Sequence, residues 1–430
     1  MKIAFADQSF HWPPTGGSWI DVREIARNLI SAGMETRIFT PVCTRWNIPG
    51  GQILSDPGVP VETFDVTREN YNAKFLPVLF REKIHHWNPD AVIISNTFYL
   101  APSLISALCD FPIFLRIFAY ELICPNYASL YRGDVFKWSA HQSQICPNNL
   151  LTNTIQCWWC ALSHMAGTLI GSRLNPVADE YWKSNAFLPQ YSSYMKTTLP
   201  KLKSLIVSTP FIRDRFASSD IRIDVIPGGV DAEQFAAQPI KRQNNQPVNI
   251  LMAGRSDDRR KGFEIFEDAI ISLKKQYPFI NAYVTDPRSE FNSPVINSKG
   301  WIDRKDIPKL YQSMDIIVCP SLWPEPFGLV PLEAMACGIP VVVSDTGGMH
   351  YTVDHMKTGI RIEPGSSLQL VKALRTLIEN PSLRDSMGKA GRQRVLTHFN
   401  WSQIVKTFYI PLLTEIATEP LDWTRMLGRP

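Results

Sequence analysis

The stretch from 315 to 345 constrains the fold more than any other part of the chain. A short apolar run at 315–319 predicts a buried strand, and a second apolar run follows at 339–344. Residues 327–337 lie between these runs, consist of good helix formers and stop at Gly338, a residue type that commonly ends helices. The order strand, loop, helix, strand is the repeating unit of a parallel α/β sheet.

The loop and helix of this unit carry groups suited to a sugar ligand. The amides of Phe327, Gly328 and Leu329 lie at the predicted helix N-terminus, where N–H groups lack partners within the helix and can bond a ligand oxygen. Glu325 and Glu333 flank these amides, and carboxylates accept hydrogen bonds from paired hydroxyls such as those of a ribose or a hexose. If the ligand also has a diphosphate, the repulsion between a unit charge and each acid about 5 Å away is roughly 3 kcal/mol at an effective dielectric constant near 20. Cations must offset this repulsion. The motif therefore predicts a basic partner loop.

Such a basic loop follows the predicted strand at 249–254. Its sequence RSDDRRKG begins after Gly254 and leads into a helix that starts at Phe263. Arg255 and Lys261 occupy the two ends of this turn, and a cation pair at the entry to a helix suits an anion. We therefore expect both cations to meet the ligand that the two acids bind.

Together these motifs resemble the retaining family-4 glycosyltransferases, which have the GT-B fold. The resemblance rests on Glu325 and Glu333 with seven residues between them, on Arg255 and Lys261, and on IPGGVDAEQF at 226–235. It implies an α/β protein of two Rossmann-like, doubly wound domains that face each other across a cleft, with a C-terminal helix that crosses back. It also implies transfer of a sugar from a nucleotide diphosphate sugar to an acceptor hydroxyl, in glycan or polysaccharide biosynthesis, with retention at the anomeric carbon.

The hypothesis gives each site residue a role. Arg255 and Lys261 stabilise charge on the departing β-phosphate, as a metal ion does elsewhere, and Glu325 holds sugar hydroxyls near the reacting carbon. These three are the predicted catalytic residues, and no metal is expected. The predicted donor-binding residues are Gly16, Gly17, Gly254, Phe327, Gly328, Leu329 and Glu333, with Glu333 on the ribose. Two alternatives stay open: a nucleotide-sugar epimerase or phosphorylase of the same fold, and a sugar-nucleotide-binding protein without turnover.

The N-terminal residues predict a second sheet of the same kind. A strand at 2–7 is followed by a loop with Gly16 and Gly17, a helix at 18–32 and another strand at 35–41. This order opens a doubly wound sheet, whose ligand crevice lies at the carboxyl ends of the strands. In the resembled family the backbone of this glycine loop lines the donor and acceptor cleft, whereas the alternative is a tight turn that simply needs glycine.

The expected domains divide the chain into four parts. They are an N-terminal acceptor-side domain (1–235, with an insertion at 118–165), a linker (236–247), a nucleotide-sugar-binding domain (248–400) and a C-terminal helix and tail (401–430) that packs back on the first domain.

The insertion is rich in cysteine and aromatic residues and departs from the strand and helix rhythm. Cys124, Cys146, Cys157 and Cys160 offer a tetrahedral zinc site, although their irregular spacing favours buried reduced thiols, and a redox pair is a further option. Long loops in compact domains usually serve a function, so we expect the insertion to shape the acceptor side.

Two positions depart from the family pattern. Many relatives carry a histidine where this chain has Phe118, and a glutamate where it has Tyr351. Sugar recognition is therefore expected to differ, with Glu121 or His11 as a substitute for the histidine.

Composition limits the partners and the compartment. A chain of 430 residues with 45% hydrophobic residues suits two or three globular domains, and a net charge of +4 is too small to indicate nucleic acid. The first apolar run spans only 3–6, so no signal sequence is expected and the predicted location is cytoplasmic. Lys196, Lys201 and Lys203 favour either a solvated helix face or peripheral contact with the inner membrane surface. The expected partners are a nucleotide-sugar donor and a glycan, lipid-linked or small-molecule acceptor.

Overall fold

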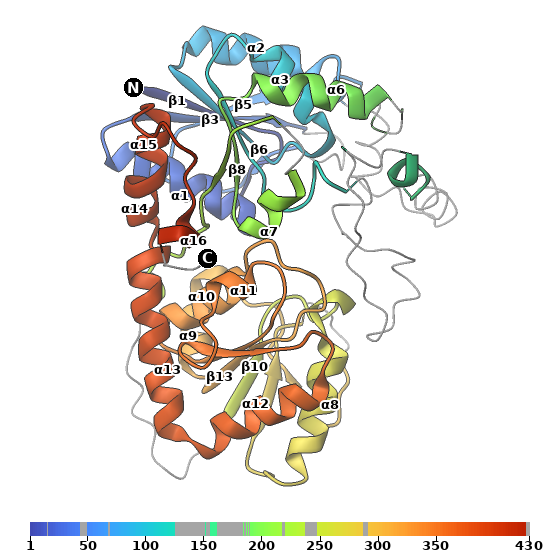
Figure 1. The fold of residues 1–430 in the computed structure, drawn as a ribbon, viewed down its shortest axis with the longest axis vertical. Coiled ribbons are helices and arrows are strands. Elements are labelled where there is room, and N and C mark those ends of the chain that lie inside the picture. The colour runs from blue at the N-terminus through green and yellow to red at the C-terminus, as the bar shows by residue number, and fades with distance from the viewer. Residues whose placement is uncertain are drawn as a thin grey trace. The chain divides into compact units, whose positions relative to one another are not determined.

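The described part of the chain forms two compact units. The computed structural model describes residues 1–426 except 15, 44–49, 68, 125–150, 152–154, 161–183, 185, 187, 189, 217–219, 237–246 and 287–290. The first unit comprises described residues up to 227 together with 405–426, and the second comprises 228–404. Figure 1 shows that each unit is built around a sheet with helices beside it.

A seven-stranded parallel sheet forms the centre of the first unit. In sheet order its strands are β5 (Val61–Asp65), β3 (Glu35–Val42), β1 (Lys2–Asp7), β6 (Ala91–Ser95), β7 (Ile113–Arg116), β8 (Ser204–Val207) and β9 (Ile223–Val225). A separate pair joins β2 (His11–Trp12) to β4 (Gln52–Ile53). The described helices include α1 (Gly17–Ser31), α2 (Leu76–Trp87), α3 (Ala101–Ala107), α6 (Gln190–Thr198), α7 (Pro210–Arg213), α15 (Ile410–Leu413) and α16 (Trp423–Met426). Continuous apolar runs explain the central strands, because β1 and β6 are almost wholly buried, as in sheets covered on both faces.

The strand order of the first sheet reverses between β1 and β6, and a buried carboxyl group lies at this point. Asp7 ends β1 and is fully buried. Its Oδ2 accepts hydrogen bonds from Ser95 Oγ and Asn96 Nδ2, both at 2.7 Å, and its Oδ1 accepts one from the Ser9 amide at 3.0 Å. Burial raises the pKa of Asp7 to about 6, although these three hydrogen bonds oppose the shift.

The Asp7 shift predicts a pH dependence of stability. The Asp7 carboxyl group holds its proton more tightly in the folded protein than in the unfolded chain. Protonation of Asp7 therefore stabilises the fold, fully below pH 3.8, and this stabilisation is lost as the pH rises through about 6. A shift of about two pKa units corresponds to roughly 3 kcal/mol. The asparagine in Asp7→Asn does not titrate. The free energy of unfolding of this variant, relative to that of wild type, should therefore rise by about 2 to 3 kcal/mol between pH 4 and pH 7. Urea unfolding at both pH values measures this difference, and a difference that does not change with pH would contradict it.

The second unit contains a six-stranded parallel sheet. In sheet order its strands are β12 (Asn297–Ser298), β11 (Asn281–Val284), β10 (Asn249–Met252), β13 (Ile316–Cys319), β14 (Val341–Ser344) and β15 (Gly359–Ile362). Its helices include α8 (Phe263–Lys274), α9 (Ile307–Gln312), α10 (Leu329–Ala336), α11 (Met349–Thr352), α12 (Ser367–Glu379), α13 (Pro381–Arg394) and α14 (Trp401–Ile404). The inward faces of α8 and α12 bury apolar residues at helical spacing, among them Phe266, Ile270, Leu370 and Leu374, in one core with β10, β11 and β13.

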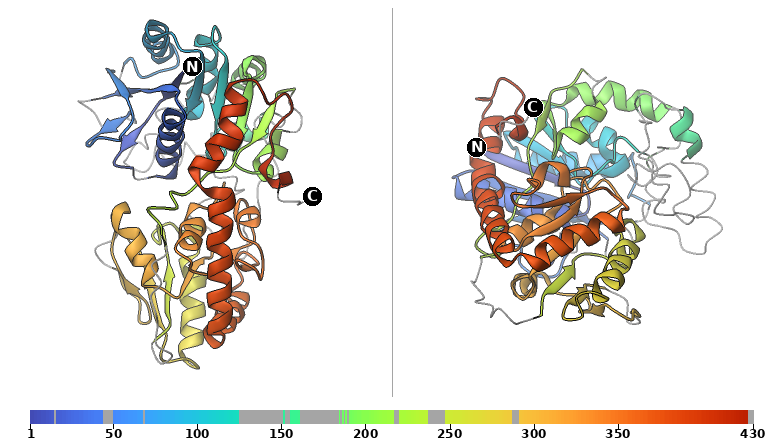
Figure 2. Two further views of the ribbon diagram at one scale, coloured as in Figure 1. Left: turned by 90° about the vertical axis from the view of Figure 1, so that its left-hand side faces the viewer. Right: turned by 60° about the horizontal axis from the view of Figure 1, so that its bottom comes forward.

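The end of the chain belongs to the first unit. Among its residues, the Leu421 carbonyl accepts a hydrogen bond from the Val225 amide (2.7 Å), and Trp423 Nε1 donates to the Ser208 carbonyl (2.9 Å). The helical run of this region includes Pro411. The left panel of Figure 2 shows a helix at the red end of the chain. Pro411 lies in the first turn of α15, directly after a π-helical turn at Val405–Tyr409, so its missing N–H does not break the run.

The fold expected from the sequence is confirmed: two parallel, Rossmann-like sheets and a C-terminal segment that returns to the first of them. Two boundaries differ. Helix α10 begins at Leu329 and not at 327, because Gly328 takes a left-handed backbone conformation (φ +90°). The first unit ends at 227 and not at 235, since the Val230 amide donates to the Phe399 carbonyl (2.8 Å) within the second unit.

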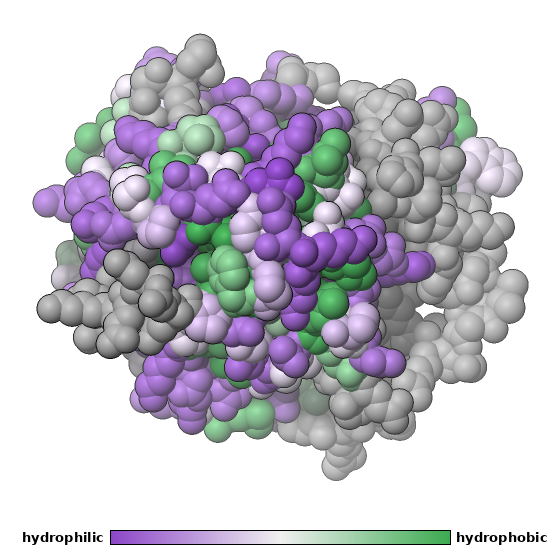
Figure 3. All heavy atoms as spheres, turned by 90° about the horizontal axis from the view of Figure 1, so that it is seen from below, coloured by the Kyte–Doolittle hydropathy of each residue, from purple (hydrophilic) through white to green (hydrophobic). Residues whose placement is uncertain are grey.

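Two surface properties bear on the expected partners. No helix among the described residues is both long enough and apolar enough to cross a membrane. The face drawn in Figure 3 mixes hydrophilic and hydrophobic residues, with hydrophilic ones predominating. Exposed large apolar side chains of the second unit come from separate segments, as is normal on a protein surface: Phe279 and Trp301 lie in two different loops and Leu368 on α12.

Candidate functional site

Two loops of the second unit meet at the carboxyl edge of its sheet. The basic loop (253–262) follows β10 and the acidic loop (320–328) follows β13, and these strands are parallel neighbours. The Arg260 carbonyl accepts hydrogen bonds from the amides of Leu322 (2.8 Å) and Trp323 (3.2 Å). A Cβ atom on Gly262 would lie only 2.1 Å from the Pro320 carbonyl oxygen. The two loops therefore pack backbone against backbone.

Lys261 and Glu325 form the central contact between these loops. Lys261 Nζ lies 2.6 Å from Glu325 Oε1, and the two side chains are 29% and 16% exposed. Ser321 Oγ lies 3.1 Å from the same carboxylate oxygen. The structure thus places one predicted cation and one predicted acid in direct contact, partly shielded from water and still accessible to a ligand.

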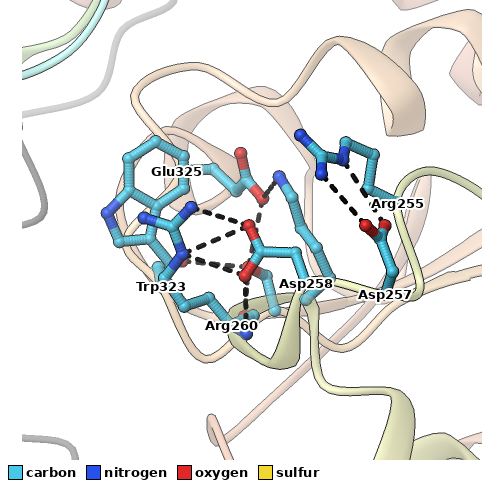
Figure 4. A network of polar contacts seen from close by, with 8 residues as sticks. Arg255, Asp257, Asp258, Arg260, Trp323 and Glu325 are labelled. Atoms are coloured by element: carbon cyan, nitrogen blue, oxygen red, sulfur yellow. Dashed lines mark hydrogen bonds and ion pairs between the residues drawn. The ribbon is translucent and has the colours of Figure 1, made fainter. Parts of the chain in front are cut away.

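Arg255 has a different partner. Its guanidinium donates to Asp257 of its own loop (3.0 Å), and its side chain is 63% exposed. Figure 4 shows Arg255 and Asp257 beside each other, apart from the group formed by Glu325, Trp323, Arg260 and Asp258. Gly254, the residue before it, has φ +108° and its amide donates to Thr285 Oγ1 (2.9 Å). These contacts fix the start of the basic loop.

Glu333 lies buried on α10 and is paired within the protein. Arg304 NH1 donates to Glu333 Oε1 at 2.8 Å, and Tyr311 Oη lies 3.5 Å from Oε2. Burial raises the pKa of the Cys319 thiol at the end of β13, with further contributions from the charges of Glu325 and Glu333. Both predicted acids follow β13, Glu325 in the loop directly after this strand and Glu333 on the helix that comes next. Arg304 belongs to none of the sequence motifs and comes from a separate 3₁₀ turn at Arg304–Asp306.

A glycine pair after β14 supports the acidic loop. The Gly348 amide donates to the Glu325 carbonyl at 2.6 Å. A Cβ atom on Gly347 would lie 2.3 Å from that carbonyl oxygen, and one on Gly348 would lie 2.3 Å from Phe327 Cα. Because no larger residue fits these positions, the glycine pair sets the path of the loop that carries Glu325.

The predicted amide donors fall around the start of α10. Phe327 and Gly328 precede the helix, and Leu329 is its first residue. The Phe327 ring packs edge-on against Phe399, with ring centres 5.9 Å apart. Tyr351, at the second departure from the family pattern, accepts a hydrogen bond on its carbonyl from Arg394 NH2 (3.0 Å).

The remaining predicted site residues lie in the first unit. Gly16 caps α1 with an extended backbone (φ −144°), and Gly17 is the first residue of that helix. Phe118 lies against the Arg116 guanidinium, with 5.6 Å from Cζ to the ring centre.

Each of the two candidate substitutes for a histidine at 118 has a partner in the first unit. Glu121 accepts the Ala119 amide at 3.1 Å, and burial raises its pKa. His11 Nε2 lies 2.7 Å from the Gly50 carbonyl oxygen, and burial lowers its pKa. Neither contact by itself indicates a sugar ligand.

The zinc prediction falls partly outside the described residues. Cys146 is not among them, whereas Cys124 and Cys157 are buried and Cys160 is half-buried. Within the described ranges, no three or more His, Cys, Asp or Glu residues are grouped as a metal site requires. The role of the insertion stays a prediction.

Comparisons of the whole fold define the class first. Two parallel Rossmann-like sheets of seven and six strands, with a returning C-terminal segment, form a GT-B fold. Sucrose-phosphate synthase from Thermosynechococcus elongatus superposes with a TM-score of 0.65 at 20% identity, over 97% of this chain and 100% of that one. The structure of HepE from Anabaena in complex with UDP-glucose superposes with a TM-score of 0.63 at 18% identity, over 97% and 99%.

The sequence comparisons match parts of the chain to known proteins. Residues 235–394, which are less than half of the chain, match the family model described as glycosyl transferases group 1. Glycogen synthase from Mycobacterium tuberculosis is 27% identical over 240 residues, 52% of this chain and 57% of that protein. D-inositol 3-phosphate glycosyltransferase from Paenarthrobacter aurescens is 29% identical over 224 residues, 46% and 54% of the two chains. The chain thus matches little more than half the length of these curated relatives.

Proposed function

We propose that this protein transfers a glycosyl group from a nucleotide diphosphate sugar to an acceptor hydroxyl, with retention at the anomeric carbon. The contact between Lys261 Nζ and Glu325 Oε1, 2.6 Å apart at the carboxyl edge of the second sheet, carries the proposal. This edge is where open α/β sheets bind ligands. A cation and a carboxylate in one partly exposed place suit a ligand that presents phosphate oxygens beside hydroxyl groups.

The reaction gives the two groups different tasks. The bond between the sugar C1 and the β-phosphate oxygen breaks, and a bond forms from C1 to the acceptor oxygen. The acceptor proton passes to the released nucleoside diphosphate, so atoms and charge balance. Lys261 and the first amides of α10 stabilise the charge that grows on the β-phosphate, while Glu325 accepts hydrogen bonds from the sugar hydroxyls. Arg255 is assigned to the same diphosphate and Glu333 to the ribose, which requires each to share or exchange its present partner.

The proposed donor is a UDP-sugar, with UDP-glucose as the first candidate. Its support is the GT-B fold shared with HepE, a protein whose structure holds UDP-glucose. The proposed acceptors present a hydroxyl on a glycan, a lipid-linked sugar or a small alcohol, and the proposed pathway is glycan or polysaccharide biosynthesis. The relative D-inositol 3-phosphate glycosyltransferase makes the small alcohols a class to include.

The test is release of nucleoside diphosphate by the purified full chain. We would combine UDP-glucose, UDP-N-acetylglucosamine, GDP-mannose and ADP-glucose with one acceptor from each class and detect the diphosphate and the glycoside together. We expect one donor to yield both products in equal amounts, and Glu325→Gln to lose most of this turnover. Conversion of the donor without any acceptor would indicate an epimerase. Release of a sugar phosphate when inorganic phosphate is supplied as the attacking group would indicate a phosphorylase. Tight donor binding without any product would indicate a binding protein, and each of these results would overturn the proposal.

A further inference from the structure

Trp323 of the acidic loop lies against two cations of the basic loop. Its ring centre is 5.4 Å from Arg260 Cζ and 5.4 Å from Lys261 Nζ. Figure 4 shows the indole beside the Arg260 guanidinium, on the side of the site where Glu325 lies. Both distances are within the range of cation–π attraction, which is strongest for tryptophan. One indole therefore contacts the predicted catalytic lysine and its neighbour together.

Arg260 is itself held in place, so the indole has a fixed support. Asp258 binds the guanidinium through two parallel hydrogen bonds, from Nε to Oδ1 (2.9 Å) and from NH2 to Oδ2 (2.7 Å). Asp258 Oδ1 also accepts the Arg260 amide (3.0 Å), which caps the 3₁₀ turn that carries Lys261. Burial alone would raise the pKa of Asp258, but the hydrogen bonds and charge of Arg260 lower it overall. Arg260 is thus neutralised within its own loop and serves as a support for Trp323.

Lys261 needs such a support because a lysine side chain has four rotatable bonds and an ammonium group without directional preference. In the structure its Nζ contacts Glu325 and the indole. Under the proposed function Glu325 turns to the sugar hydroxyls and the ammonium to phosphate, so the contact between Lys261 and Glu325 weakens during the reaction. An aromatic face attracts a cation and not an anion, so the ring need not leave the ammonium when Glu325 changes partner.

We propose that Trp323 is a positioning residue that holds the Lys261 ammonium at the diphosphate position, and that the pair Asp258 and Arg260 holds Trp323. This inference rests on the proposed function, because it assigns the lysine to the donor phosphates. It predicts that the aromatic face is what matters at position 323. Phenylalanine keeps an aromatic face at this position, whereas leucine is an apolar side chain of size similar to phenylalanine and has no such face.

A double-mutant cycle tests whether Trp323 acts through Lys261. We expect Trp323→Leu to lower kcat/KM for the nucleotide sugar about tenfold and Trp323→Phe to stay within about threefold of wild type. In a Lys261→Ala background, Trp323→Leu should change kcat/KM less than about twofold, because the group it positions is gone. An equal loss with and without Lys261 would overturn the inference. Arg259→Gln removes a positive charge from the same turn at an exposed side chain that pairs with Glu264, and it should leave kcat/KM within about twofold.

A second measurement does not depend on turnover. Limited acetylation with acetic anhydride, followed by peptide mass spectrometry, compares the labelling rate of Lys261 with that of Lys275, an exposed lysine of the same unit. We expect Trp323→Leu to raise this ratio severalfold, because the ring no longer stabilises and covers the ammonium, and Trp323→Phe to leave it near the wild-type value.

Arg260→Met provides an independent variant, since it removes the guanidinium and keeps the backbone carbonyl that joins the loops. It should raise the ratio as well, even where Trp323→Leu fails to fold. An unchanged ratio in Arg260→Met and in any folded Trp323→Leu protein would overturn the positioning role. Because labelling needs no donor, a protein that turns over no nucleotide sugar can still show the positioning, and the two failures are distinguishable.

Discussion

Replacement of Lys261 by alanine is expected to lower kcat by about two to three orders of magnitude. The ammonium lies 2.6 Å from Glu325 Oε1 and 5.4 Å from the Trp323 ring centre. Negative charge moves onto the β-phosphate as the bond to the sugar breaks, and a cation already in place stabilises that charge without reorganisation. Steady-state kinetics at saturating donor measure the effect, because the interaction strengthens as the charge develops and therefore acts on kcat.

The matched control is Arg259→Ala in the same 3₁₀ turn. Its side chain is 61% exposed and pairs with Glu264, so its loss should leave kcat within about twofold. Lys261→Ala removes a partly exposed ion pair, which contributes up to about 1 kcal/mol to stability, so both variants should keep the wild-type circular dichroism spectrum. A wild-type rate for Lys261→Ala would refute the assignment. Equal losses in both variants would show that only the summed positive charge of the loop matters.

The contact between Lys261 and Glu325 was predictable because each residue follows an apolar strand. Parallel strands that are neighbours in a sheet bring their following loops to one edge, and β10 and β13 are such neighbours. Strand order is not readable from the apolar runs themselves, and here the family resemblance supplied the expectation. Trp323 and Arg260 stand inside the same motifs but were not singled out. Residue spacing alone does not tell which face of an indole packs against which loop.

Arg255 and Glu333 show a different limit of reasoning from residue types. Their charges were expected to meet a ligand, whereas in the structure each has a protein partner: Asp257 pairs with Arg255, and Arg304 from a separate turn pairs with Glu333. Such partners reduce the net charge that a ligand meets, and the donor has to compete with them. The predicted roles of both residues therefore require an exchange of partners, while Lys261 already faces Glu325, its expected neighbour in the site.

Replacement of Gly262 by alanine is expected to have the second large effect. This residue has φ +81°, which costs an alanine about 1 to 2 kcal/mol, and its Cβ would lie 2.1 Å from the Pro320 carbonyl oxygen. The clash is with backbone, so it is relieved only if the basic and acidic loops move apart, at a further cost of about 1 to 3 kcal/mol. Calorimetry of the full chain should show the unfolding midpoint lowered by about 4 to 20 °C, at roughly 2 to 4 °C per kcal/mol. Turnover should fall too, since separation of the loops separates Lys261 from Glu325.

Gly300→Ala separates the two contributions. Gly300 has φ +70° in the same unit, and a Cβ there meets no atom within 4 Å, so only the backbone strain remains. It should lower the midpoint by no more than about 2 to 8 °C and leave turnover unchanged. If Gly262→Ala costs no more than Gly300→Ala, the loops tolerate separation and the close packing at Pro320 does not hold them together. If Gly262→Ala costs more stability and nonetheless keeps wild-type turnover, catalysis does not depend on the contact between the two loops, and the assignment of Lys261 and Glu325 to one site fails with it.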